Sequence, residues 1–122
     1  MIEEITARVN ADTALVRRGR FVSLDFLVGV GEADYIVSVR EGHIAGVENR
    51  RVQTHTGRFS VRASSDVWAE HWKLMPQRGR HDLFSMVAAG LAEFDGDLLP
   101  LMQNLQYFKD VLSSPRPVAA EG

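Results

Sequence analysis

Residues 21–30, FVSLDFLVGV, contain the pattern that most constrains the fold of this chain. Apolar side chains occupy every second position, and neighbouring side chains of a strand point to opposite faces of the sheet. One face of this strand is therefore fully apolar, and another layer of the protein has to cover it. The residues on that face are Val22, Leu24, Phe26, Val28 and Val30.

Three further segments are predicted to be strands: residues 33–41, 43–51 and 58–64. Glu41-Gly42 is a tight hairpin signal between two of them. Most of these strands have one apolar face and one more polar face, which favours an antiparallel sheet covered on one side. Residues 91–97, LAEFDGD, are expected to form a short fifth strand or an extended link.

Helices are expected near the N-terminus and through most of the second half. They are predicted at residues 2–9, 67–75, 81–90 and 98–112. Residues 10–20 have a weak apolar pattern, which predicts a connection or a frayed helical extension. Two prolines and a lack of core residues predict a disordered tail at 114–122. The expected architecture is one α+β domain over residues 1–113, with helices on one face of the sheet.

Composition excludes several classes of function. The chain has 122 residues, a formal net charge of −2 and no cysteine. Nucleic acid is not an expected partner because the chain has no excess of basic residues, and disulfides and cysteine metal sites are excluded. The acidic start MIEEITARVN is unlike a signal peptide, so a cytoplasmic location is expected. Small arginine clusters allow at most peripheral contact with a membrane.

No motif for catalysis, a metal or a cofactor is present in the sequence. The four histidines lack the spacing of a helical metal site: His43, His55, His71 and His81. VGVGEAD at 28–34 lacks the third glycine of a dinucleotide loop, and a strand follows it, so it predicts a hairpin turn. We therefore expect neither a metal nor a cofactor.

The most apolar stretch is FDGDLLPLMQNLQYF at 94–108, which predicts a helix with a long apolar stripe. Trp68 and Trp72 are spaced to share one side of another helix. Such residues fill an ordinary core, but large side chains and adaptable methionines also line pockets for apolar ligands. The pattern alone leaves both alternatives open.

Several segments resemble the sterol carrier protein type 2 family over roughly residues 15–113. They are REGHIAGVE at 40–48, FSVRASSDVWAEHW at 59–72 and MVAAGLAEFDGDLLPLMQNLQYFKDVL at 86–112. The last of these resembles that family's helix, glycine, short strand ending in Gly-Asp, and closing helix rich in Leu and Met. The short LAEFDGD and the insert MPQRGRHD at 75–82 depart from the family pattern.

The resemblance implies a five-stranded, mainly antiparallel sheet covered by helices, with an apolar cavity between the two layers. It implies non-catalytic binding and carriage of a fatty acid, acyl-CoA or sterol-like molecule. Leu24 and Phe26 would form the floor of the cavity. Trp68, Trp72 and Phe84 would form one side of it. The whole closing helix would be its lid and one wall, with three side chains facing the cavity: Met102, Leu105 and Phe108.

Two other functions remain open at this point. A small cone-shaped α+β enzyme, such as an isomerase or hydratase, needs an acid or base in an apolar pocket, and the candidates are Asp25 and His71. A non-binding interaction module would use the apolar helix to pack against a second copy. The sequence is compatible with a monomer and with a homodimer.

Overall fold

The protein is built on a five-stranded sheet with the strand order β3-β2-β1-β4-β5. The computed structural model describes residues 2–50, 55–73, 76 and 82–117. The strands are β1 (Leu24–Val30), β2 (Ala33–Arg40), β3 (His43–Asn49), β4 (Phe59–Ala63) and β5 (Ala92–Gly96). The predicted α+β architecture, including the fifth strand, is confirmed.

Strand pairing is antiparallel except at the centre of the sheet, where β1 and β4 run parallel. Side-chain alternation does not reveal strand direction, so this pair could not be predicted from the strand pattern. The first strand also begins later than predicted, at Leu24. Phe21 precedes it with 86% of its surface exposed, while Val22 is buried.

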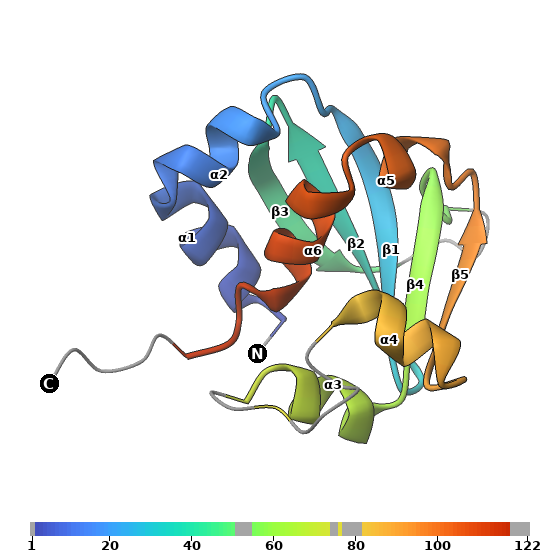
Figure 1. Cartoon of the computed structure of the whole chain (residues 1–122). Helices are drawn as coiled ribbons and strands as arrows, with labels where there is room; N and C mark the ends of the chain where they lie inside the picture. Colours follow the sequence, from blue (N-terminus) through green and yellow to red (C-terminus); the bar gives the residue numbers. More distant parts are fainter. Residues whose placement is uncertain (1, 51–54, 74–75, 77–81, 118–122) are drawn as a thin grey trace, which may run out of the picture.

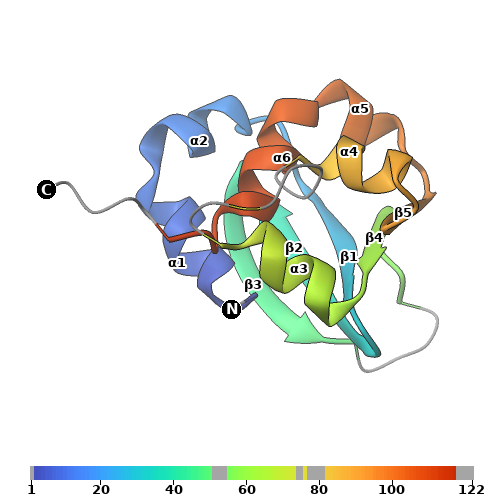
Figure 2. The ribbon, with the colours of Figure 1, turned by 60° about the horizontal axis from the view of Figure 1, so that its bottom comes forward.

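The helices cover one face of the sheet, as Figures 1 and 2 show from two directions. They are α1 (Glu4–Ala11), α2 (Thr13–Arg18), α3 (Ser65–His71), α4 (Leu83–Ala88), α5 (Leu99–Gln103) and α6 (Leu105–Ser113). Helix α1 lies against the edge strand β3, where the Asn10 side chain exchanges two hydrogen bonds with the backbone of Ile44, of 2.8 and 3.0 Å. This side chain satisfies backbone groups that an edge strand leaves unpaired.

Side-chain caps fix the starts of three helices. The Ser64 hydroxyl accepts from the Val67 N–H at 3.2 Å, and the Asp82 carboxylate accepts from the Ser85 N–H at 3.2 Å. Serine and aspartate are both preferred at this position, because their side-chain oxygens accept from the free N–H groups of the first helical turn. Asp12 starts α2 in the same way, so the expectation of a connection or frayed extension at residues 10–20 missed a separate, capped helix.

The closing helix predicted at 98–112 is two helices, so that prediction is wrong. The chain breaks at Asn104, which has φ −125° and ψ 38°, and the Asn104 side-chain amide donates to the Pro100 carbonyl at 3.0 Å. The break rotates α5 relative to α6. The expected stripe is divided as a result, because Leu101 and Phe108 are buried while Met102 is 47% exposed.

The chain after α6 stays packed further than expected. Arg8 donates to the Arg116 carbonyl at 2.8 Å, and the Arg116 guanidinium donates to the His71 carbonyl at 3.0 and 2.7 Å. Pro115 is buried between these contacts. Residues 114–116 are therefore packed against the rest of the protein, and the predicted disorder of residues 118–122 lies outside the described residues.

A charged cluster spans the face of the sheet that points away from the helices. Asp34 lies 2.6 Å from both Arg50 and Arg62, and the first of these pairs is largely buried. Gly29 stands between Asp34 and Arg62 in the register, and a Cβ there would come within 2.7 Å of the Arg62 side chain. Glycine at this position lets Arg62 cross β1 to reach Asp34.

Gly31 then turns the chain into β2, which confirms the predicted hairpin at 28–34.

Candidate functional site

Three phenylalanine rings fill the middle of the space between the sheet and α6. Phe26 of β1 stacks on Phe59 of β4 with 5.1 Å between the ring centroids. Phe108 of α6 meets both rings edge-on, at 5.4 and 5.1 Å. All three rings are fully or almost fully buried, so they join the two layers through aromatic contacts of favourable geometry. We call these three residues the phenylalanine cluster.

A second aromatic pair joins α3 to the rest of the core. Trp68 and Trp72 stack with centroids 5.1 Å apart. The Trp68 indole N–H donates to the Gly29 carbonyl at 2.8 Å, and the Trp72 indole N–H donates to the Leu112 carbonyl at 2.7 Å. Both buried donors are thereby satisfied, and α3 is tied to β1 and to the end of α6.

The eight predicted ligand-contacting residues divide into two groups of four. One group is buried: Phe26, Trp68, Trp72 and Phe108. The other is partly or largely exposed: Leu24, Phe84, Leu105 and Met102. Phe26 and Phe108 touch each other, whereas Met102 faces outward from α5. The role of all eight in binding a ligand stays a prediction.

The sequence interpretation missed Phe59 as part of this site. The strand pattern at 58–64 already showed Phe59 on an apolar face. What it did not show was that β4 lies directly beside β1, since that depends on the parallel pairing. A ring on a neighbouring central strand is then brought into contact with Phe26.

A polar groove of about 320 Å³ lies at the beginning of β1, and we call it the β1 groove. It is lined by Ser23, Leu24, Asp25, Arg40, His55, Gly57 and Arg58. Its charged residues come from three separate segments of the chain, so no local spacing in the sequence could have revealed it. Among the residues that line it, Leu24 is a predicted ligand-contacting residue and Asp25 a predicted candidate catalytic group.

Asp25 and His71, the candidate catalytic groups, lie in different parts of the molecule. Asp25 is in the β1 groove, 3.1 Å from Arg40 and 3.4 Å from His55. His71 is buried on α3 beside Trp68, which bonds to Gly29 near the other end of β1. The strand from Asp25 to Gly29 alone spans roughly 13 Å, at about 3.3 Å per residue. The two groups therefore do not form one acid–base pair.

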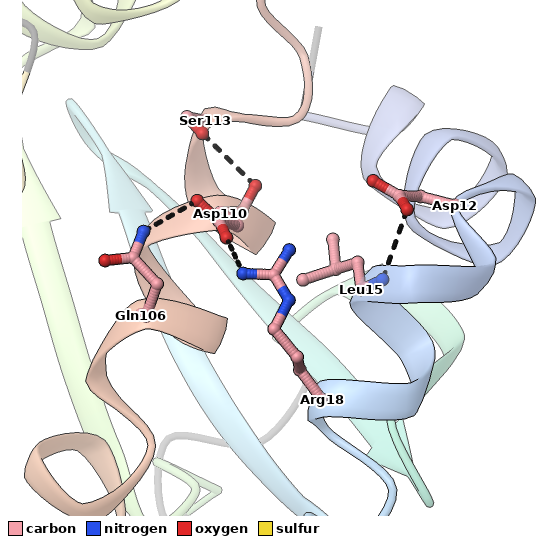
Figure 3. A network of polar contacts seen from close by, with 6 residues as sticks. All are labelled: Asp12, Leu15, Arg18, Gln106, Asp110 and Ser113. Carbon is pink, nitrogen blue, oxygen red and sulfur yellow. Dashed lines mark hydrogen bonds and ion pairs between the residues drawn. The ribbon is translucent and has the colours of Figure 1, made fainter.

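Helix α6 is held in place by contacts on several sides. Arg18 of α2 donates to Asp110 at 2.6 Å, and Gln106 donates to the other carboxylate oxygen of Asp110 at 3.0 Å (Figure 3). Lys109 lies 2.8 Å from Asp82, the residue that caps α4. On the buried side, the Tyr107 hydroxyl donates to the Gly42 carbonyl at 2.7 Å. These contacts fix α6 to α2, to the start of α4 and to the β2–β3 hairpin.

The Tyr107 hydrogen bond gives a testable dependence on pH. Burial raises the pKa of the Tyr107 hydroxyl from its ordinary value of 10.0 to about 12. The contribution of this group to stability is complete below pH 10 and is lost as the pH rises toward 12, because the unfolded chain ionises first. At pH 9, Tyr107→Phe is expected to lower the free energy of unfolding by about 1 kcal/mol, since the Gly42 carbonyl loses its donor.

Urea denaturation of the wild type and the Tyr107→Phe variant, side by side between pH 9 and 12, measures this effect. The difference between the two free energies of unfolding is expected to shrink with rising pH. A difference that stays constant over this range would show that Tyr107 ionises equally easily in the folded and unfolded states.

Helix α5 is held much more weakly than α6. Leu101 is its one buried side chain, whereas Leu99 is 62% exposed. The start of α5 is fixed by Asp97, whose carboxylate accepts from the Leu99 N–H at 3.2 Å. Asp97 also pairs with Arg58 at 3.7 Å, on an exposed surface where such a pair contributes little. The free energy needed to displace α5 from the core is therefore little more than that of exposing the Leu101 side chain to water.

Comparison with known proteins identifies the fold. No family model matches the chain, and no curated protein matches it in sequence. A crystal structure of sterol carrier protein 2 is 16% identical, with a TM-score of 0.74 over 97% of this chain and 95% of that one. A conserved hypothetical protein from Thermus thermophilus, described as possibly a sterol carrier protein, is also 16% identical, with a TM-score of 0.67 over 99% of this chain and 90% of that one.

A third solved structure, a ubiquinone synthesis protein named UbiJ-SCP2, is 19% identical with a TM-score of 0.60, over 93% of this chain and 91% of that one. At these identities the likeness establishes the fold alone. The chain thus has the sterol carrier protein 2 fold over almost its whole length, as its sequence motifs suggested. Over the described residues, no helix has the length and apolar character needed to cross a membrane.

Proposed function

We propose that this protein binds a hydrophobic small molecule of the fatty acid, acyl-CoA or sterol type between its sheet and its helices. In this proposal the protein carries the molecule and does not transform it. The observation that best supports the proposal is the continuous apolar layer between β1, β4 and α6, centred on the phenylalanine cluster, in a chain with the sterol carrier protein 2 fold. Binding would be driven by burial, at about 0.8 kcal/mol for each methylene group removed from water.

The positions of the acidic and basic side chains support the non-catalytic part of this proposal. The phenylalanine cluster offers only hydrocarbon surface to a ligand, and general acid–base catalysis needs a titratable group within hydrogen-bond reach of the substrate. Asp25 lines the β1 groove and pairs with Arg40 and His55. His71 lies beside the tryptophan pair on α3.

Entry of a ligand requires movement, because the phenylalanine rings already touch one another. Helix α6 is fastened to α2, α4 and the β2–β3 hairpin, whereas α5 is anchored by Leu101. The break at Asn104 allows α5 to swing while α6 keeps its place. We therefore assign the gate to α5 alone. The sequence-based expectation was that the whole closing helix forms the lid.

Native mass spectrometry of the freshly purified protein tests the proposed function. One lipid-sized mass per chain, identified after solvent extraction, is the expected result. The protein is then stripped and titrated with lauric acid, lauroyl-CoA and cholesterol, with Trp68 and Trp72 as the fluorescent reporters. A chain that keeps its apo mass with all three compounds would show that the apolar layer is only a packed core.

The gate is tested by two leucine substitutions in the same helix. Leu101→Ala removes the buried anchor of α5 and is expected to speed the dissociation of bound laurate by roughly tenfold or more. Leu99→Ala, the matched control, removes an exposed side chain and should leave the rate unchanged. Stopped-flow fluorescence measures both rates. Equal rates in the two variants would place the gate somewhere other than α5.

A further inference from the structure

The β1 groove has a charge pattern that the apolar core does not explain. Three basic side chains line it: Arg40 at the end of β2, and His55 and Arg58 in the segment that leads into β4. Leu24 lines the groove as well and also packs against the buried core. The groove and the apolar layer therefore meet at Leu24. Figures 1 and 2 both place α5 beside this beginning of β1.

Asp25 contacts two of these basic side chains. One carboxylate oxygen accepts from Nη1 of Arg40 at 3.1 Å, and the other lies 3.4 Å from Nε2 of His55. Nη1 of Arg40 also donates to the Val39 carbonyl at 2.6 Å. Both hydrogen bonds of Arg40 use Nη1, and a guanidinium carries five N–H donors in all. Arg40 is thus fixed in position with donors left for a ligand.

Of the two arginines in the groove, Arg58 has the longer distance to its nearest carboxylate. Its nearest carboxylate, Asp97, lies 3.7 Å away, which is too long for a hydrogen bond. Its side chain is 58% exposed, and its backbone N–H is fixed by the Asp25 carbonyl at 2.8 Å. Gly57 next to it allows close packing on β1, because a Cβ there would lie 2.6 Å from the Asp25 carbonyl oxygen. The backbone of Arg58 is thus fixed beside β1, and its side chain starts from a fixed position at the groove.

We propose that the β1 groove binds the anionic oxygen head group, carboxylate or phosphate, of an amphiphile whose hydrocarbon tail passes Leu24 into the apolar layer. This inference rests on the proposed function and names the chemical class of its ligand. Guanidinium groups bind carboxylate and phosphate oxygens through paired, charge-assisted hydrogen bonds. Arg58 and Arg40 supply these donors, and the Ser23 hydroxyl and His55 add two more polar groups.

Three ligands with the same tail length test the inference: laurate, dodecyl phosphate and the uncharged methyl laurate. The wild type is expected to bind one of the two anions roughly tenfold more tightly than methyl laurate, and the preferred anion identifies the head group. Arg58→Gln should bring this affinity ratio close to one. Arg40→Gln is a second variant with the same expected effect. Arg17→Gln, at the end of α2 outside the groove, removes the same charge and should preserve the ratio.

The outcomes separate the two proposals. If none of the three ligands binds, the proposed function fails and the head-group site fails with it. If all three bind equally well, or if Arg58→Gln weakens anions and ester alike, the apolar site stands and the head-group site is overturned. A ratio that Arg17→Gln lowers as much as Arg58→Gln does would also overturn it, because the preference would then reflect overall charge. Competition by inorganic phosphate shows whether the anion is bound without its tail.

Discussion

Replacing Phe108 by alanine is expected to lower the free energy of unfolding by about 3–5 kcal/mol. The Phe108 ring is fully buried and contacts Phe26, Phe59 and Tyr107, with centroid distances of 5.1 to 5.4 Å. Its removal leaves a void in the middle of the molecule that neighbouring rings on rigid strands fill poorly. Urea denaturation followed by circular dichroism gives the difference directly.

The control for this substitution is Leu99→Ala on α5, an exposed change that should stay within about 0.5 kcal/mol of the wild type. A loss of only about 1 kcal/mol in Phe108→Ala would mean that the ring lines open space rather than filling a core. The measurement thus decides how tightly the phenylalanine cluster is packed in solution, independently of any ligand.

Replacing Asp34 by asparagine is expected to lower the free energy of unfolding by about 3 kcal/mol. The side chains of Asp34 and Arg50 are only 15% and 13% exposed, and their charged atoms lie 2.6 Å apart. The substitution removes the carboxylate that Arg50 and Arg62 share and leaves a largely buried cation without this anion. Urea is the appropriate denaturant because it adds no salt.

Asp97→Asn provides the matched control. Asp97 is also an aspartate paired with an arginine, but that pair with Arg58 is exposed on both sides and its atoms are 3.7 Å apart. The expected change is below about 0.5 kcal/mol. Equal effects of the two substitutions would contradict a special role for the buried cluster and would point to overall charge instead.

Much of the fold could be predicted because strand periodicity is a local property. The alternation from Val22 to Val30 follows directly from burial on one face. Glu41-Gly42 marks a turn because glycine readily adopts a positive φ, such as the 83° of Gly42. Helix caps such as Asp82 are local as well. The parallel pairing of β1 with β4 and the break at Asn104 depend on tertiary packing, which no short stretch of sequence contains.

The sequence predicted several of the residues of the candidate site, but not how these residues are arranged. Periodicity placed Phe26 and Phe108 in the apolar layer, and both are there. The orientation of Met102 could not be predicted because it depends on the helix break. The β1 groove could not be predicted either, since Asp25, Arg40 and Arg58 are far apart in sequence and meet only when the strands align.

The parallel pair at the centre of the sheet also has a consequence for biosynthesis. Strand β1 can form a hairpin with β2 as soon as both have left the ribosome, but its other side waits for β4, because Leu27 pairs with Ser60. Closing so long a loop is slow compared with forming a hairpin. Until then, the apolar strand FLVGV exposes a row of unpaired backbone groups to which another chain can add. The emergence of Phe59–Ala63 from the ribosome is therefore the moment at which this edge of β1 can be paired and protected.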